Sequence, residues 1–170
     1  MRPSLIPLLC ALAPPPAAPT AAAPRPEDVA SIDGIIKAFY EVVCVAPGQT
    51  PDWARDRTLY IPGVRFVSMS VSKEGKPEAH VLSHPEFIEF SAPLARDGFW
   101  EREIHRSTFR FGNIAHVLST YESRRSEKGR MLGRGVNSIE LYWDGKRWWI
   151  ASAIWDTERP GNPLPKDLLP

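Results

Sequence analysis

The residues best suited to transfer a proton are His105 and Glu103, two positions apart within a predicted strand. Alternate residues of a strand point to the same face, so these two side chains would lie together with Ser107. A carboxylate beside an imidazole can tune it for acid and base chemistry near neutral pH. The alternative is an ordinary exposed sheet surface, because arginines alternate with these residues along the strand.

Tyr121 and Asn137 are the other polar candidates. Tyr121 shares one strand face with Ala115, Val117 and Ser119, so its hydroxyl is expected to point into the interior. Asn137 alternates with Ile139 and Leu141, which also favours an inward position. A buried amide needs hydrogen-bond partners, and a ligand could supply one. Two alternatives stay open: an amide satisfied by neighbouring backbone, and an ordinary packing tyrosine.

Four long strands must position these side chains. The alternating stretches cover residues 99–112, 113–125, 134–145 and 146–156. Turn residues separate them at Gly112-Asn113, at 126–129 and at Asp144-Gly145, which predicts antiparallel neighbours. No carboxylate in these strands stands out as a base embedded among apolar residues.

The first half of the chain is predicted to supply helices and two shorter strands. An apolar stripe with helical spacing runs from Val29 to Cys44, with Asp28 or Ser31 as its cap. Residues 51–57 form a short helix, 64–72 and 78–82 a hairpin, and 83–97 a further helix. Helices gathered on one side of an antiparallel sheet give an α+β fold, with a strongly curved sheet wrapped on the helices.

Composition argues against several classes of partner. The chain has 170 residues and a formal charge of +1, without a basic stripe interleaved with aromatic residues, so nucleic acid is not expected to bind. The histidines at 80, 84, 105 and 116 lack the spacing of a metal site, and no glycine-rich phosphate loop is present. We expect neither a metal nor a cofactor.

Residues 1–24 have the layout of a secretory signal peptide. Arg2 precedes a short apolar run, prolines 14–16 break it, and alanines 21–23 offer a cleavage site. The run is too short for a stable membrane span, and the alternative is a Pro/Ala-rich tail. We therefore expect a periplasmic or secreted protein. The mature part, residues 25–170, would be a single domain with a proline-rich tail from about 158, and would keep only Cys44, without an internal disulfide.

The last predicted strand, residues 148–155, is apolar on both faces. Such a strand must be covered on both sides. The helices would cover one face, and a second copy of the chain would cover the other. We therefore expect a homodimer formed through the sheet face.

Several stretches together resemble a known superfamily. The element order, Phe111–Val117 (FGNIAHV) and the ending RGVNSIELYWDGKRWWIASAIWD are similar to the nuclear transport factor 2-like superfamily, and most similar to its SnoaL-like branch in exported bacterial proteins. The resemblance implies a cone-shaped, cystatin-like α+β barrel whose interior holds a pocket. It implies His105, Tyr121 and Asn137 as catalytic candidates, and a pocket lined by Tyr40, Trp53, Tyr60, Phe66, Phe90, Ile139 and Trp155.

Three functions are compatible with this resemblance, because one fold hosts many activities. The first is a domain that binds a small, mostly apolar molecule without chemistry. The second is an isomerase, dehydratase or cyclase that transfers a proton inside the pocket. The third is a non-catalytic dimerisation module whose interior is filled by aromatic side chains.

Overall fold

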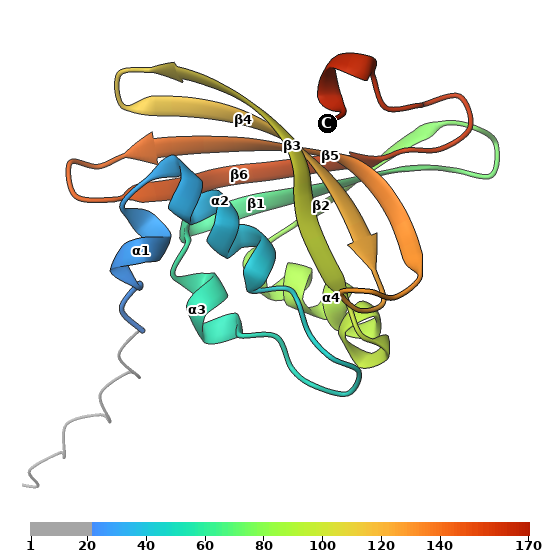
Figure 1. The fold of residues 1–170 in the computed structure, drawn as a ribbon, viewed down its shortest axis with the longest axis horizontal. Coiled ribbons are helices and arrows are strands. Elements are labelled where there is room, and N and C mark those ends of the chain that lie inside the picture. Colours follow the sequence, from blue (N-terminus) through green and yellow to red (C-terminus); the bar gives the residue numbers. More distant parts are fainter. Residues whose placement is uncertain (1–21) are drawn as a thin grey trace, which may run out of the picture.

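Six strands form one curved sheet in the computed structural model, which describes residues 22–170 (Figure 1). The strand order is β2-β1-β6-β5-β4-β3. The strands are β1 (Tyr60–Val71), β2 (Pro77–Leu82), β3 (Trp100–Phe111), β4 (Ile114–Arg124), β5 (Met131–Trp143) and β6 (Trp148–Thr157). β1 and β6 are parallel, and all other neighbours are antiparallel. The predicted α+β class is confirmed, but the expected barrel does not close, since β2 and β3 remain edge strands.

The helices α1 (Pro26–Val29), α2 (Ile32–Glu41), α3 (Trp53–Arg57) and α4 (His84–Asp97) lie on one side of this sheet (Figure 1). The single first helix predicted from the apolar stripe is divided, because Ser31 is extended and caps α2 by accepting a hydrogen bond from the Gly34 amide. In α4, Ser83 and Glu86 form a reciprocal capping box. These caps satisfy backbone amides at the first turns of α2 and α4.

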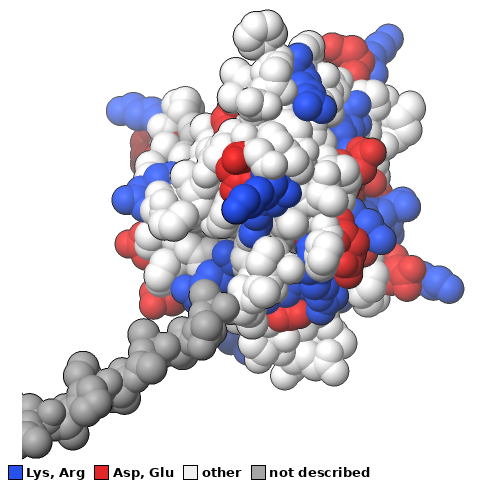
Figure 2. Space-filling model, turned by 90° about the vertical axis from the view of Figure 1, so that its left-hand side faces the viewer, with Lys and Arg blue, Asp and Glu red and all other residues white. Residues whose placement is uncertain are grey.

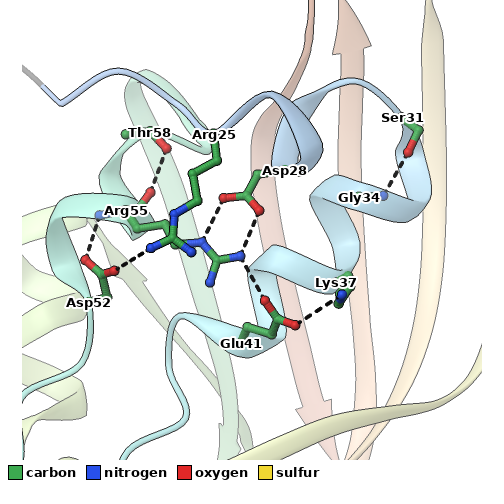
Figure 3. A network of polar contacts seen from close by, with 9 residues as sticks. All are labelled: Arg25, Asp28, Ser31, Gly34, Lys37, Glu41, Asp52, Arg55 and Thr58. Carbon is green, nitrogen blue, oxygen red and sulfur yellow. Dashed lines mark hydrogen bonds and ion pairs between the residues drawn. The ribbon is translucent and has the colours of Figure 1, made fainter.

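An ion-pair network joins the first three helices (Figure 3). Arg55 of α3 donates two hydrogen bonds to Asp28 of α1, both at 2.7 Å, and a third to Glu41 of α2 at 2.8 Å. Asp28 is buried and Arg55 nearly so. Bidentate contacts of this kind are strong and directional. The network therefore fixes the short helices α1 and α3, which are too short to be stable alone.

Two β-bulges decide which side chains face the helices. Between Glu103 and His105 the β3–β4 register slips by one residue, so Ile104 has no partner. A second slip in β6 leaves Ala151 unpaired opposite Glu140 and Leu141. A bulge reverses the alternation on either side of it. Strands that look continuous in sequence therefore change face partway along.

The core lies between the helices and the concave side of the sheet. Its fully buried members include Ile35, Ile36, Leu59, Phe66, Val117, Ile139 and Ile150. The C-terminal segment with η1 (Lys166–Leu168) lies on the opposite side of the sheet, where the Leu168 carbonyl accepts a hydrogen bond of 2.7 Å from Thr120 (Figure 1). The tail thus packs on the outer face and does not enter the helix-covered interior.

The predicted signal peptide falls almost wholly on residues 1–21, which lie outside the described part of the chain. Within residues 22–170, no helix has the length and apolar character needed to cross a membrane. Basic and acidic side chains are interspersed on the face seen in Figure 2.

Candidate functional site

A cavity of about 330 Å³ lies between α4, α2 and the concave side of the sheet. This volume is at the lower end of the range for small-molecule sites. Its walls are largely aromatic, from Phe39, Trp53, Phe66, Phe87, Phe90, Phe99, Tyr121 and Trp155. Its polar lining comes from Ser68, Ser91, Glu101, Ser123, Asn137 and Thr157. The cavity thus has the composition of a binding site for a small, mostly apolar molecule.

Glu101 is the one carboxylate among the residues that line this cavity. It is half-buried, and its side-chain oxygens have no hydrogen-bond partner among residues 22–170. Burial away from water raises the pKa of Glu101 to about 8, since no cation offsets the desolvation. Glu101 can therefore be charged or neutral near neutral pH, as an acid–base catalyst must be.

Glu101 was missed in the sequence because of the bulge at Ile104. If residues are paired outward from the Gly112-Asn113 turn without a slip, Glu101 falls opposite Arg124 on the outer face. The slip instead places Glu101 opposite Ser123, which lines the cavity. The expectation that no carboxylate lies among apolar residues is therefore corrected. Only the irregular register could have revealed Glu101.

The same bulge separates His105 from Glu103. His105 pairs with Thr120, whose hydroxyl contacts the tail on the outer face. Glu103 pairs with Tyr121 on the concave side. The expected shared face of His105, Glu103 and Ser107 is corrected, and His105 does not line the cavity. Glu103 instead binds Arg106, which also reaches Asp33 of α2.

Tyr121 and Asn137 do line the cavity together, as their alternation predicted. The Tyr121 hydroxyl lies 3.2 Å from the Thr157 hydroxyl, and burial raises the pKa of Tyr121 to about 12. Asn137 donates a hydrogen bond of 3.0 Å from Nδ2 to the Tyr40 hydroxyl. Gly135 leaves room for Tyr121, because a Cβ there would lie 2.5 Å from the Tyr121 hydroxyl. Tyr121 is thus held as a neutral phenol at the cavity wall.

Trp53, Phe66, Phe90 and Trp155 line the cavity as expected, whereas Tyr40, Tyr60 and Ile139 do not. Tyr40 lies behind Asn137, where its hydroxyl is 2.6 Å from the Ser119 hydroxyl. Tyr60 turns to Asp56, and Ile139 is wholly buried in the core. These three residues support the walls from behind.

A second buried polar cluster lies outside the cavity. The wholly buried carboxylate of Asp56 is 2.5 Å from Nε2 of His84, and it accepts a hydrogen bond of 3.0 Å from the Tyr60 hydroxyl. Nδ1 of His84 is buried without a hydrogen-bond partner. The cluster connects α3, β1 and the start of α4. Because none of its members lines the cavity, we regard it as a structural link.

Nothing in the described part of the chain gathers the ligands of a metal ion: residues 22–170 contain no group of three His, Cys, Asp or Glu side chains placed to hold one. Cys44 is a free thiol whose pKa burial raises to about 11, so it is a poor nucleophile. The chemistry open to the cavity is therefore proton transfer by Glu101 beside the Tyr121 phenol and the Asn137 amide.

The chain resembles known proteins in structure. No protein-family model and no curated protein matches the sequence. A nuclear transport factor 2-like protein from Silicibacter pomeroyi is 15% identical, with a TM-score of 0.52 over 76% of this chain and 94% of that one. A protein from Kribbella flavida is 11% identical, with a TM-score of 0.57 over 76% and 90%. A candidate ketosteroid isomerase from Shewanella frigidimarina is 18% identical, with a TM-score of 0.50 over 74% and 95%.

At these identities the similarity concerns the fold, and the neighbours do not separate the SnoaL-like branch from its relatives. The strand order, the helix-covered concave face and the structural neighbours agree with the resemblance seen in the sequence. The chain has the nuclear transport factor 2-like fold.

Proposed function

We propose that this protein is an enzyme that shifts a proton within a small, mostly apolar molecule, an isomerase or dehydratase in which Glu101 is the acid–base group. The observation that carries the proposal is the Glu101 carboxyl group, which lines an aromatic cavity without a protein partner and has a pKa of about 8. An unpaired carboxylate that is shielded from water destabilises a fold, so its presence in a cavity points to a function.

The surrounding groups fit such a reaction. In its ionised form, Glu101 would take a proton from a carbon next to a carbonyl group, and in its protonated form it would return that proton to another carbon. The negative charge that develops on the substrate oxygen would need a hydrogen-bond donor. The Tyr121 phenol can donate when the Thr157 hydroxyl donates to it. The candidate ketosteroid isomerase from Shewanella frigidimarina shares the fold, which is compatible with this reaction class.

The proposal can be tested with cyclic β,γ-unsaturated ketones of one to four fused rings. Isomerisation gives a conjugated enone, which is followed by its ultraviolet absorbance. We expect conversion by the wild-type protein, a kcat/KM that rises with pH up to about 8, and loss of conversion in Glu101→Gln. Glu140→Gln, on the exposed outer face, is the matched control. If no ketone reacts yet several bind, the non-catalytic binding function replaces the enzyme.

Association of two copies through the outer face of the sheet remains a second proposal. Phe109, Phe111, Ile114 and Ile154 are large apolar residues with 62%, 85%, 60% and 41% exposure. By strand register they lie on the face opposite the cavity. Exposed apolar surface of this kind favours an interface. Sedimentation of the wild type against Phe109→Asp would test it, and a monomeric wild type would contradict it.

Export is proposed on the sequence of residues 1–24 alone. Mass spectrometry of the chain expressed with these residues would detect the expected N-terminal cleavage, and an uncleaved product would contradict it.

A further inference from the structure

We infer that Asn137 presents its carbonyl oxygen to the cavity, and that the ligand carries a hydroxyl or N–H donor where it meets this oxygen. The inference rests on the proposed function only in taking the cavity as the ligand site. It follows from a chain of hydrogen bonds that runs from Glu103 through Ser119 and Tyr40 to Asn137. Once the donor of the first hydrogen bond is known, the donor and acceptor of each following hydrogen bond are determined.

Glu103 fixes the direction at one end of this chain. Arg106 donates to both of its oxygens, with Nε 2.8 Å from Oε1 and Nη2 2.6 Å from Oε2. Beside a guanidinium, the Glu103 carboxylate is an acceptor only. The Ser119 hydroxyl, which contacts Oε1, must therefore donate its single hydrogen to Glu103.

The direction then passes through two hydroxyl groups. Because Ser119 has given its hydrogen to Glu103, its oxygen accepts from the Tyr40 hydroxyl at 2.6 Å. Burial raises the pKa of Tyr40 far above its ordinary value, so the phenol keeps this hydrogen. The Tyr40 oxygen in turn must accept its remaining hydrogen bond, and it does so from Nδ2 of Asn137 at 3.0 Å.

The orientation of the Asn137 amide follows. A flipped amide would set its oxygen against the Tyr40 oxygen with no hydrogen between them. Because Nδ2 is hydrogen-bonded to Tyr40, Oδ1 accepts no hydrogen bond from residues 22–170. Oδ1 is nevertheless not fully enclosed by protein atoms. Asn137 lines the cavity, so this carbonyl is available to a ligand.

The ligand class narrows accordingly. A ketone or ether oxygen placed at Asn137 would meet another acceptor and leave both unpaired, which is costly in an apolar cavity. A phenol, an alcohol or an N–H group would satisfy it. Together with the aromatic walls, this polarity selects a compact aromatic or fused-ring molecule that bears a hydrogen-bond donor.

Three naphthalenes of similar size test this selection in the full-length protein. They are 2-naphthol, which donates, 2-methoxynaphthalene, which only accepts, and naphthalene itself. Binding is measured by calorimetry at about pH 6, where Glu101 and naphthol are both protonated. We expect 2-naphthol to bind about tenfold more tightly than the other two, a typical effect of one satisfied hydrogen bond.

Ser119→Ala tests the chain itself without altering a cavity wall, because Ser119 does not line the cavity. Without Ser119, the Tyr40 hydroxyl can donate to Asn137, whose amide then turns its Nδ2 to the cavity. We expect the preference to reverse toward 2-methoxynaphthalene. Tyr40→Phe removes the restraint on the amide and should abolish the preference. Ser138→Ala, at an outer-face serine that contacts His116, should keep the wild-type preference.

The outcomes separate this inference from the proposed function. Equal affinities of the three compounds for the wild type, or an unchanged preference in Ser119→Ala, would overturn the role of Asn137 and leave Glu101 untouched. Failure of all three to bind would overturn both the inference and the cavity as a ligand site. A tenfold preference in a protein without ketone isomerisation would support Asn137 and reject the enzyme.

Discussion

Asp56 and Glu101 are acidic residues turned toward the interior of the same fold, yet their surroundings are opposite. Asp56 is wholly buried and accepts hydrogen bonds from His84 and Tyr60. Glu101 lines a cavity, and no residue of the described chain donates to its carboxylate. The first carboxylate connects structural elements, and the second is left for a ligand.

This contrast shows that burial alone does not identify a functional carboxylate. Desolvation is offset at Asp56 by donors supplied from α4 and β1. At Glu101 it is not offset, and the cost appears as a raised pKa. A destabilising group of this kind is expected at a functional site. The presence or absence of partners is therefore the useful criterion, and it can be tested at both residues.

The largest expected effect is the loss of activity in Glu101→Gln. The substitution preserves size and removes the titratable group, so turnover of a reactive ketone should fall about 10²- to 10⁴-fold. The folded structure should persist, as measured by circular dichroism. Asp56→Asn serves as the comparison and should keep its turnover. If Asp56→Asn lost turnover while Glu101→Gln kept it, the roles assigned to the two residues would be wrong.

Asp56→Ala should lower the free energy of unfolding by about 3–5 kcal/mol. The change leaves the Tyr60 hydroxyl and Nε2 of His84 buried without their acceptor, in addition to the unpartnered Nδ1. Urea unfolding followed by tryptophan fluorescence measures the loss. Asp52→Ala removes an exposed helix cap and should cost only about 1 kcal/mol. Equal losses in the two variants would show that the buried cluster has no special role.

Glu101 should also make stability depend on pH. Its pKa is about 8 in the folded protein against an ordinary value of 4.5, so the folded state holds the proton more tightly. The contribution of Glu101 to stability is therefore highest below about pH 4.5, falls by roughly 2–4 kcal/mol as the pH rises toward 8, and then levels off. Urea unfolding of the wild type and Glu101→Gln across this range isolates the effect. A variant that retains the full slope would refute it.

Tyr60→Phe should have the smallest effect of the series. It removes one of the two donors to Asp56 and keeps the ring, so the free energy of unfolding should fall by about 1 kcal/mol. Because Tyr60 does not line the cavity, ligand affinity should be unchanged. Tyr121→Phe is the counterpart at the cavity wall, and it should alter catalysis more than stability. If both variants changed catalysis and stability to the same extent, the proposed difference between the two regions would be contradicted.

Much of the fold could be predicted from the sequence because regular periodicity determines it. Alternation placed Tyr121 and Asn137 at the cavity, and their strands begin and end near the expected turns. The site could be predicted only in part. Glu101 and His105 would share a face in a regular strand, and a single unpaired residue that no periodic pattern reveals places them on opposite faces. Tyr40 and Tyr60 are predicted to line the cavity only from their positions in a helix and a loop. Such positions do not determine which group the hydroxyl contacts, and here the partners are Ser119 and Asp56.

The unpaired Ile104 has a consequence for how such a protein can change its chemistry. If the residues before Ile104 slid by one position along β4, Ile104 would gain a partner, pairing would be continuous, and Glu101 and Glu103 would face outward. The aromatic walls, which come mostly from other elements, would stay in place. A one-residue shift of pairing in an edge strand could thus exchange the reactive groups of a pocket while conserving its shape, and sequence divergence among proteins of this fold could proceed by such steps.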